Sequence, residues 1–294
     1  MSKQTIRFII NPISGTRKKR NLPEIIDKVL DKEKYDYEIK LSEYPGHAKL
    51  LAQEAVEQHI DIVVAAGGDG SINEVGVPLI DTSTALGIIP CGSGNGLSHH
   101  LDLPMTAPEA VKIINIGKRY KIDTVTVNGI PFISIAGTGF DAKVANDYAN
   151  DPRRGFDTYL KYIVKDYFEY KEEKYRIVMP ERTVIAKAMF ISFANSNEQG
   201  FNIPISPNAS LQDGKVDLCI VRKPNVAELP IMGGFMLNRK MDKAPKVDIF
   251  QTSKATIIRE KANVINIDGE SVMTEKDLEI EVKPLSLNII AYEK

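Results

Sequence analysis

The residues best suited to chemistry in this sequence are 67–71, which read Gly-Gly-Asp-Gly-Ser. They follow residues 62–66, a short apolar run rich in β-branched residues that is typical of a strand buried on both faces. Ser71 is a common N-cap residue and predicts a helix that begins at about Ile72. A strand that leads through a glycine-rich turn into a helix presents backbone N–H groups and the positive end of a helix dipole to an anion. The pattern therefore predicts a phosphate-binding loop.

The alternative interpretation is an ordinary strand-to-helix turn, in which glycine only permits a positive φ. Three glycines around one aspartate, at the start of a capped helix, favour phosphate binding over that alternative. The loop is not a Walker A sequence, because no Gly-Lys-Ser/Thr follows, and it does not match the dinucleotide pattern Gly-x-Gly-x-x-Gly. Support for phosphate binding must therefore come from other segments of the chain.

Strands and helices are predicted to alternate through the first third of the chain, and they must position this loop. Strand patterns occur at 6–10, 37–41, 62–66 and 85–89, and helix patterns at 20–30, 47–58, from about 72, and at 108–116. This alternation favours a parallel sheet with helices on both faces. Three of the four strands end in loops rich in Gly, Asn, Ser or Asp, namely 11–15, 67–71 and 92–96. Because the carboxyl ends of parallel strands meet at one edge of a sheet, we expect these loops to converge on one polyphosphate.

After about Lys121 the pattern changes to short β-rich runs separated by Gly, Pro and Asn, which predicts an antiparallel β-sandwich. The predicted strands are 125–127, 132–135, 176–178, 188–193, 216–221, 255–259, 264–267 and 278–282, with helical insertions near 140–148, 158–169 and 226–241. We therefore expect an α/β protein with a Rossmann-like three-layer N-terminal domain and a second, β-sandwich domain. The predicted domains are 1–122 and 123–284, with a final strand near 285–294 that returns to the first. A cleft between two domains is the usual ligand site.

Composition limits the class of protein. The chain of 294 residues is long enough for two domains, and its 43% hydrophobic and 26% charged residues are typical of a soluble globular protein. A formal net charge of −1 gives no overall attraction to nucleic acid. Cys91 and Cys219 lie far apart without a metal-binding spacing, so we expect reduced, buried thiols in a cytoplasmic protein. No apolar run approaches the roughly 18 residues of a spanning helix.

Residues 67–75, Gly-Gly-Asp-Gly-Ser-Ile-Asn-Glu-Val, closely resemble the nucleotide loop of the diacylglycerol kinase catalytic domain family, which includes soluble bacterial diacylglycerol kinases, sphingosine kinases and ceramide kinases. Asn-Pro-x-Ser-Gly at 11–15 is similar to the first loop of that family, and Pro-x-Gly-Ser-Gly-Asn at 90–95 to the third. Later motifs recur in family order at 137–142, 207–214 and 268–270, so the resemblance spans the whole chain. One departure is Asn-Glu-Gln-Gly at 197–200, where relatives often have a run of glycines.

The resemblance implies transfer of phosphate from ATP, with Mg²⁺, to a lipid hydroxyl in a cleft between the two domains. It implies that Asp268 takes the hydroxyl proton, that Glu270 helps to hold metal or to orient this base, and that Asp69 acts on Mg²⁺ through water. The nucleotide contacts carried over from the family are Asn11, Pro12, Ser14, Gly15, Ser42, Gly67, Gly68, Asp69, Gly70, Ser71, Asn73, Glu74, Gly92, Ser93 and Asn95. The resemblance further implies a structural Mg²⁺ at Asp213, with backbone carbonyls near Ser210 and Lys215.

Several of these residues also have a purely structural interpretation. An Asp-Gly pair between two β runs is by itself a hairpin turn, which is the other interpretation of Asp268. Asp213 also suits a turn, Glu270 suits a solvated acid, and Ser42 suits a helix entry. The stretch 232–241 carries Gly, Phe, Met and Leu beside two basic residues and could touch a membrane surface, but core packing is favoured.

The sequence therefore predicts a cytoplasmic lipid kinase that uses ATP and Mg²⁺. Its predicted partners are a lipid substrate, such as diacylglycerol or a sphingoid base, and a transient membrane surface, with a homodimer as a further assembly and no nucleic acid. An NAD kinase-like enzyme is the alternative, because it shares the Gly-Gly-Asp-Gly loop, and a non-catalytic nucleotide-binding regulator is a third. The acids Asp69, Asp268 and Glu270 argue against a regulator. Which lipid is phosphorylated depends on the shape of a pocket, which a motif does not define.

Overall fold

The computed structural model describes residues 3–12, 21–149, 151, 153, 156–198 and 204–292. The chain divides into two compact units, which are Met1–Asp123 with Leu285–Lys294 (unit 1) and Thr124–Pro284 (unit 2). It passes from one unit to the other within strand β5 (Lys118–Val127) and returns within strand β16 (Asp277–Ala291). Unit 1 is therefore built from both ends of the chain.

Unit 1 contains a parallel sheet in the order β2-β1-β3-β4. The bounds of its strands are β1 (Gln4–Ile10), β2 (Tyr35–Leu41), β3 (Ile62–Gly67) and β4 (Ala85–Pro90). The C-terminal part of β16 pairs with β4 in parallel, with Asn288 opposite Ala85. Strands β3 and β4 are buried along their whole length, as expected for a parallel sheet covered on both faces.

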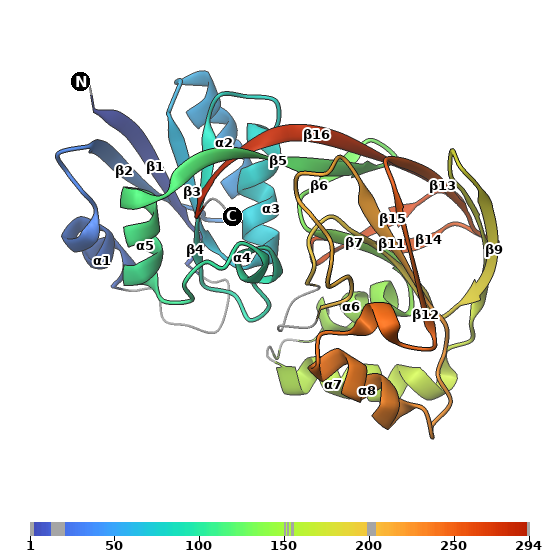
Figure 1. The fold of residues 1–294 in the computed structure, drawn as a ribbon. Helices are drawn as coiled ribbons and strands as arrows, with labels where there is room; N and C mark the ends of the chain where they lie inside the picture. Colours follow the sequence, from blue (N-terminus) through green and yellow to red (C-terminus); the bar gives the residue numbers. More distant parts are fainter. Residues whose placement is uncertain are drawn as a thin grey trace. The chain divides into compact units, whose positions relative to one another are not determined.

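Helices lie on both faces of this sheet (Figure 1). Helices α1 (Leu22–Val29) and α5 (Ala107–Ile116) share one apolar cluster with the sheet, which includes Phe8. Helices α2 (His47–Glu57) and α3 (Asp69–Gly76) pack together on the other face. There the buried Arg7 side chain donates to the carbonyl oxygen of Leu51 in α2 at 2.9 Å. The shorter helices η1 (Val77–Leu79) and α4 (Gly96–His100) complete the unit.

Unit 2 is a β-sandwich with helices on one side. Its described residues include a six-stranded antiparallel sheet, in the order β12-β11-β10-β7-β14-β15. These strands are β7 (Ile135–Gly139), β10 (Phe190–Ala194), β11 (Val216–Val221), β12 (Val247–Thr252), β14 (Asn263–Ile267) and β15 (Glu270–Thr274). The second layer combines the first part of β16 with β6 (Ile130–Phe132), β8 (Glu173–Val178), β9 (Thr183–Ala188), β13 (Lys254–Ile258) and the end of β5.

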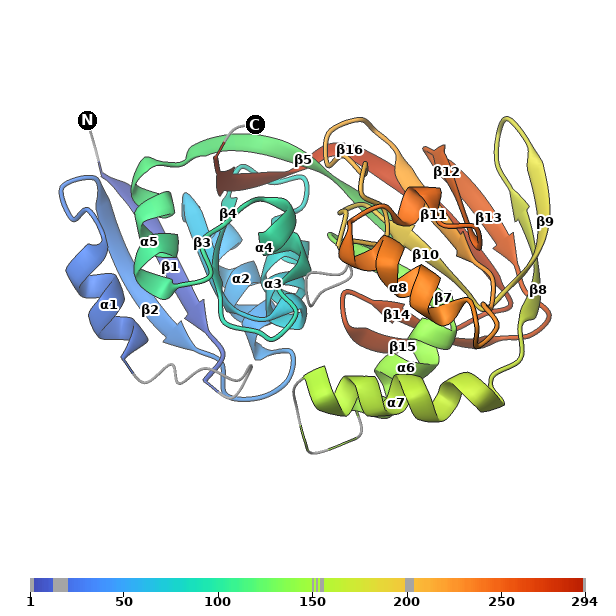
Figure 2. The same ribbon diagram turned by 60° about the horizontal axis from the view of Figure 1, so that its bottom comes forward.

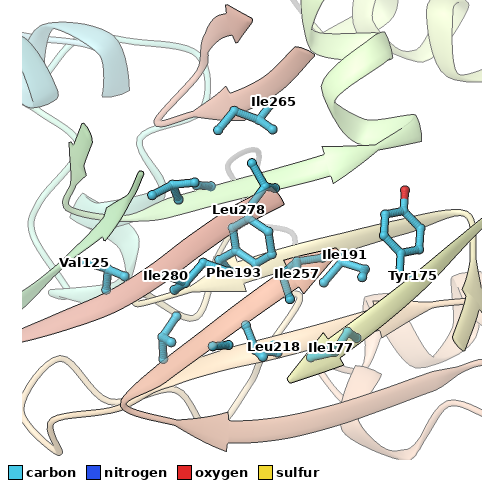
Figure 3. Close-up of a cluster of buried hydrophobic side chains, with 14 of the residues drawn as sticks. Val125, Tyr175, Ile177, Ile191, Phe193, Leu218, Ile257, Ile265, Leu278 and Ile280 are labelled. Carbon is cyan, nitrogen blue, oxygen red and sulfur yellow. The ribbon is translucent and has the colours of Figure 1, made fainter. Parts of the chain in front are cut away.

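The two layers of unit 2 enclose an apolar core, and Figure 3 shows part of it, with side chains such as Phe193, Leu218 and Ile280. Alternation along β11 explains how its sheet is buried on both faces. Leu218 belongs to the core between the layers, and Cys219 belongs to a second cluster beneath helix α8 (Leu229–Leu237). Helices α6 (Phe140–Ala149) and α7 (Phe156–Glu169) and the short η2 (Met241–Lys243) also belong to this unit. None of the described helices combines the length and the apolar character needed to cross a bilayer.

The structure confirms the predicted α/β class with a second antiparallel sheet, but some elements differ. The predicted strand 132–135 is divided between β6 and β7 by a bend at Ile133 and Ser134. The predicted helix 226–241 is limited to α8, with the short η2 after it. Strands β9, β12 and β15 were not predicted. All three lie at the end of a strand order, and such edge strands have mixed polar and apolar sequences with a weak pattern.

Candidate active site

The loops after β3 and β4 lie together at one edge of the unit 1 sheet, with Asn11, the first residue after β1, beside them. Backbone hydrogen bonds continue past the strand ends, because the Asn11 N–H donates to the Ala66 carbonyl at 3.4 Å and the Cys91 N–H to the Gly67 carbonyl at 2.8 Å. The Asn11 side chain also donates to the Ser71 hydroxyl at 3.5 Å. Three segments that are far apart in the sequence therefore converge within unit 1, as their strand order requires.

The Gly-Gly-Asp-Gly-Ser stretch forms the beginning of helix α3. Gly68 is extended, with φ −95° and ψ −171°, and its carbonyl accepts the Ile72 N–H at 2.9 Å. Asp69, Gly70 and Ser71 thus belong to the first helical turn, and the prediction that Ser71 caps a helix beginning at Ile72 is wrong. Gly68 turns the chain directly from β3 into the helix, and the helix begins without a side-chain cap. The N–H groups of a first helical turn have no acceptor within the helix, which suits them to an anion.

The second and third loops approach each other so closely that only glycine fits. A Cβ atom on Gly92 would lie 2.5 Å from the Gly68 Cα, and a Cβ atom on Gly68 would lie 3.1 Å from the Gly92 Cα. Both loops therefore place backbone next to backbone at the sheet edge. This is the arrangement in which two sets of N–H groups can approach one phosphate chain.

Asp69 connects these loops by hydrogen bonds. Its Oδ2 accepts the Asn95 N–H and its Oδ1 accepts the Gly96 N–H, each at 2.8 Å. Asn95 has a left-handed backbone (φ +54°), and its side chain bonds to the N–H and the carbonyl of Gly92 at 2.9 and 2.8 Å. Asp69 thus fixes the shape of the third loop from the start of α3. Its water-mediated action on Mg²⁺ stays a prediction.

Two further predicted contacts lie near the same edge. Ser42 is buried directly after β2, and its N–H donates to the Ile10 carbonyl at 3.0 Å. The Glu74 carboxylate in α3 accepts the Gly46 N–H at 3.3 Å, which ties α3 to the turn before α2. Among the remaining predicted contacts, Pro12 and Ser93 are exposed and Asn73 is half-buried, while Ser14 and Gly15 lie outside the described residues.

In unit 2, Asp268 and Gly269 form the tight turn between β14 and β15, with φ +46° and +93°. Two successive residues of positive φ are typical of a two-residue hairpin turn. The buried Asp268 side chain faces away from this turn toward the chain between β6 and β7. Its Oδ1 accepts the N–H groups of Ser134 at 3.0 Å and Ile135 at 2.9 Å, and its Oδ2 accepts that of Ile133 at 2.8 Å.

These three hydrogen bonds explain why the predicted strand 132–135 is bent. The N–H groups of residues 133–135 all point to one carboxylate, so the chain cannot continue as a regular strand there. A carboxylate offers about four acceptor positions, of which the backbone uses three here. Asp268 is therefore an anchor for this bend, and its role as a base stays a prediction beside that structural role.

A polar network near Asp268 was not identified from the sequence. The hydroxyls of Ser134 and Ser196 are hydrogen-bonded at 2.6 Å, and the Asn195 side chain donates to the Ile133 carbonyl at 2.7 Å. Ser134, Asn195 and Ser196 are all buried. The available signal was Asn-Ser-Asn at 195–197, directly after the apolar strand β10, which is the same kind of pattern that marked the loops of unit 1.

Glu270 and Asp213 are more exposed. Glu270 is the exposed first residue of β15, opposite Ile267. Asp213 lies in an exposed turn before β11, where its Oδ1 accepts the Lys215 N–H at 3.0 Å, and it lines a pocket of about 670 Å³ together with Arg182. The described residues contain no group of three or more His, Cys, Asp or Glu suited to a metal, so Mg²⁺ at Asp213, Ser210 and Lys215 stays a prediction.

Comparison with known proteins connects both units to one family. Residues 5–127 match the diacylglycerol kinase catalytic domain, and residues 134–291 match the YegS C-terminal NAD kinase beta sandwich-like domain. A diacylglycerol kinase of Staphylococcus aureus (strain bovine RF122 / ET3-1) is 30% identical over 274 residues, which cover 91% of this chain and 86% of the relative. One of Staphylococcus haemolyticus (strain JCSC1435) is 31% identical over 282 residues, which cover 91% and 82%.

The fold itself has a solved counterpart. The crystal structure of a diacylglycerol kinase from Bacillus anthracis str. Sterne has a TM-score of 0.79 at 21% identity, covering 99% of this chain and 98% of that chain. A parallel-sheet unit that matches a kinase catalytic domain, followed by a β-sandwich unit that matches its companion domain, places the chain in a class of two-domain kinases. This chain belongs to the diacylglycerol kinase family, and its class is that of the lipid kinases.

Proposed function

We propose that this protein transfers the γ-phosphoryl group of ATP to the hydroxyl of a lipid, with diacylglycerol as the first candidate and a sphingoid base as the second. The observation that carries the proposal is the close approach of the loops after β3 and β4 at Gly68 and Gly92, with Asn11 after β1 at the same edge of the unit 1 sheet. Membership of the diacylglycerol kinase family supports the lipid acceptor.

In this proposal the N–H groups of the first turn of α3 bind the triphosphate, the third loop lies beside it, and the side chains of Asn11 and Ser71 flank it. The lipid hydroxyl oxygen forms a bond to the γ-phosphorus while the bond from phosphorus to the ADP oxygen breaks. The hydroxyl proton passes to a base, for which Asp268 is the candidate. Mg²⁺ bound to ATP would neutralise charge on the phosphates, with Asp69 acting on it through water and Glu270 orienting the base.

Transfer of labelled phosphate tests the proposal directly. The protein is incubated with γ-labelled ATP and Mg²⁺ and with mixed micelles that contain diacylglycerol, sphingosine or an undecaprenol-like alcohol, or with NAD in solution. We expect label in one of the lipids. The NAD arm is required because the second unit matches an NAD kinase-like sandwich. Label in NAD alone, or in no acceptor, would overturn the lipid kinase proposal.

The metal is tested in the same assay. Replacing Mg²⁺ by a chelator should abolish transfer if the phosphates need a divalent cation. Asp213→Asn should weaken binding of Mg²⁺ in a calorimetric titration without ATP if the structural site exists.

Sedimentation analysis tests the predicted homodimer, and a single monomeric species would contradict that prediction.

A further inference from the structure

Buried polar residues gather at the edge of the six-stranded sheet where Asp268 lies. Strand β10 ends at this edge, and the chain continues as Asn-Ser-Asn-Glu at 195–198. The N–H groups of Asn195 and Ser196 both donate to the Ser134 carbonyl, at 3.0 and 2.9 Å. The Ser134 N–H in turn donates to the Asp268 carboxylate. Residues 195–198 are therefore hydrogen-bonded to the same bend that surrounds the candidate base.

Glu198 is the charged residue of this segment, and its side chain is only 1% exposed. Its Oε1 accepts a hydrogen bond from Nη2 of Arg239 at 2.5 Å. Its Oε2 is also buried and has no hydrogen-bond partner among the residues that the structure describes. A buried carboxylate oxygen without a donor is costly, because water no longer solvates its charge. Glu198 Oε2 therefore offers an acceptor position to a donor from another molecule.

The Arg239 partner is fixed at the end of helix α8. Its backbone is left-handed, with φ +55°, and its N–H donates to the Met236 carbonyl at 3.1 Å. Helix α8 packs across the outer face of the six-stranded sheet (Figures 1 and 2), in an apolar cluster that includes Ala194 at the end of β10. The guanidinium group is thus a fixed partner of Glu198 Oε1, and it contributes one hydrogen bond to this carboxylate.

Glu198 differs from other buried side chains that lack a hydrogen bond among the described residues. Three of these are serine hydroxyls, which are neutral and therefore cost less to bury than a charge. Another is the Asp166 carboxylate, but Lys143 Nζ lies 2.7 Å from its Oδ1 and balances its charge. In Glu198 the guanidinium accounts for one oxygen only. The packing of unit 2 alone does not explain the other oxygen.

Glu198 and Asp268 are linked through neighbouring hydrogen bonds. The Ser196 hydroxyl binds the Ser134 hydroxyl at 2.6 Å and lies 3.4 Å from the Glu198 carbonyl oxygen. Both acids are buried. In a site that excludes water, a hydrogen bond to a charged oxygen contributes more than it does at the surface. A lipid headgroup that brings its hydroxyl to Asp268 thus enters a region in which Glu198 can distinguish one headgroup from another.

We propose that Glu198 Oε2 accepts a hydrogen bond from a second donor in the lipid headgroup, beside the hydroxyl that is phosphorylated. A headgroup without this donor leaves the buried oxygen without a partner and is disfavoured. Diacylglycerol has one free hydroxyl and no second donor, whereas monoacylglycerol has a second hydroxyl and a sphingoid base has an amine. The inference rests on the proposed function, and within that function it places two-donor lipids ahead of diacylglycerol.

The ratio of kcat/KM between lipids tests this role, because a ratio measured in one preparation does not depend on the folded fraction. The full chain is assayed with γ-labelled ATP and Mg²⁺ on mixed micelles of diacylglycerol, monoacylglycerol or sphingosine. We expect one of the two-donor lipids to exceed diacylglycerol by about ten- to a hundredfold in kcat/KM. Preference for monoacylglycerol assigns the donor as a hydroxyl, and preference for sphingosine assigns it as an ammonium group.

Two substitutions of Glu198 remove the acceptor in different ways. In Glu198→Gln the Arg239 guanidinium holds the amide oxygen, so the amide N–H groups face the second donor of the lipid. Glu198→Ala removes the acceptor without adding a donor. Both variants should lose the preference for two-donor lipids. The matched control is Asp248→Asn, because Asp248 also binds an arginine, Arg222, but is 41% exposed on β12, and this variant should keep the preference.

The outcomes separate the selection of the lipid from the kinase activity. If the unaltered chain phosphorylates diacylglycerol as efficiently as the two-donor lipids, the role of Glu198 is overturned and the kinase proposal remains. A preference that persists in both Glu198 variants has the same consequence. If no lipid accepts label, the kinase proposal itself is overturned.

Discussion

At the scale of single residues, Asp268 has to be both an anchor and the candidate base. In Asp268→Asn the amide group would place an N–H donor opposite the Ile133 N–H, now 2.8 Å from the carboxylate. We expect a loss of about 1–3 kcal/mol in the free energy of unfolding and a fall in turnover of about a hundredfold or more, with ATP binding retained. Urea denaturation, calorimetry with ATP, and the transfer assay measure the three effects.

The control for Asp268 lies in the same turn. Asn266 accepts the Gly269 N–H at 3.0 Å, so Asn266→Ala weakens the turn without removing the carboxylate. Turnover should remain high in this variant at a temperature where both variants are folded. An equal fall in turnover in the two variants would make Asp268 structural only, and the base would have to be sought elsewhere.

Asp69, which follows β3, has a matched control in Asp61, which precedes β3. Asp69→Ala removes the acceptor of the Asn95 and Gly96 N–H groups, and Asp61→Ala removes the acceptor of the Thr5 N–H at 2.8 Å before β3. Each change should lower the free energy of unfolding by about 1–2 kcal/mol. We expect only Asp69→Ala to weaken binding of Mg·ATP, because only Asp69 shapes the third loop. If ATP affinity follows stability equally in both variants, Asp69 has no role beyond the fold.

Asp217 on β11 predicts a pH dependence of stability. Its side chain is buried and accepts the Ser206 hydroxyl, and burial raises the pKa of this carboxyl above its usual value. The folded state thus holds the Asp217 proton more tightly than the unfolded state does. The contribution of this proton to the free energy of unfolding is full at low pH and is lost as pH rises through the raised pKa. We expect Asp217→Asn to gain stability relative to the unaltered chain as the pH rises above about 4, the usual pKa of an aspartate. Urea denaturation measures this gain. If the free energy of unfolding changes with pH in the same way for both proteins, the prediction is contradicted. Asp248→Asn, on the neighbouring strand, is the control.

At the scale of elements, the contact between the second and third loops depends on glycine. Gly92→Ala would place a methyl group 2.5 Å from the Gly68 Cα and 2.8 Å from the Asn95 Oδ1, so the loops must separate. We expect a loss of about 1–3 kcal/mol in the free energy of unfolding, together with weaker ATP binding. Gly233→Ala in α8 is the control, because nothing lies within 4 Å of its added Cβ, and it should be neutral or stabilising. Unchanged ATP affinity in Gly92→Ala would show that the contact between these two loops plays no part in binding the nucleotide.

At the scale of the whole molecule, the last strand determines whether unit 1 is complete. β16 leaves unit 2 at Pro284, and Ile289 then pairs with Leu86 in β4 and is fully buried. We expect Ile289→Ala to lower the free energy of unfolding by about 2–5 kcal/mol and to impair ATP binding, although it is distant in sequence from every loop. Leu285→Ala, at a position that is 45% exposed, should change stability by less than about 0.5 kcal/mol. Similar effects of the two substitutions would show that the end of β16 does not support unit 1.

Much of the candidate site at the edge of the unit 1 sheet could be predicted from the sequence. Residues 62–71 carry a buried-strand pattern and three glycines within ten positions, and the strand order then requires that the loops meet. The start of α3 was misplaced because Ser71 has the chemistry of a cap, whereas the extended conformation of Gly68 begins the helix earlier. Edge strands such as β15 were missed because their alternation is weak. Local patterns indicate which type of secondary structure a segment favours, and the residues that pack against it determine where that element begins and ends.

By itself, the sequence determined the alternating order of the first unit and the change to β-rich structure after it, and it indicated which segments are candidates for phosphate binding, because these follow from local residue types and spacing. Only the tertiary structure decided what surrounds Asp268, since its carboxylate meets N–H groups more than 130 residues away. It also decided that Gly68 and Gly92 touch, and that Glu198 is buried beside Arg239. Burial and contact depend on which distant segments pack together, and no local pattern contains that information.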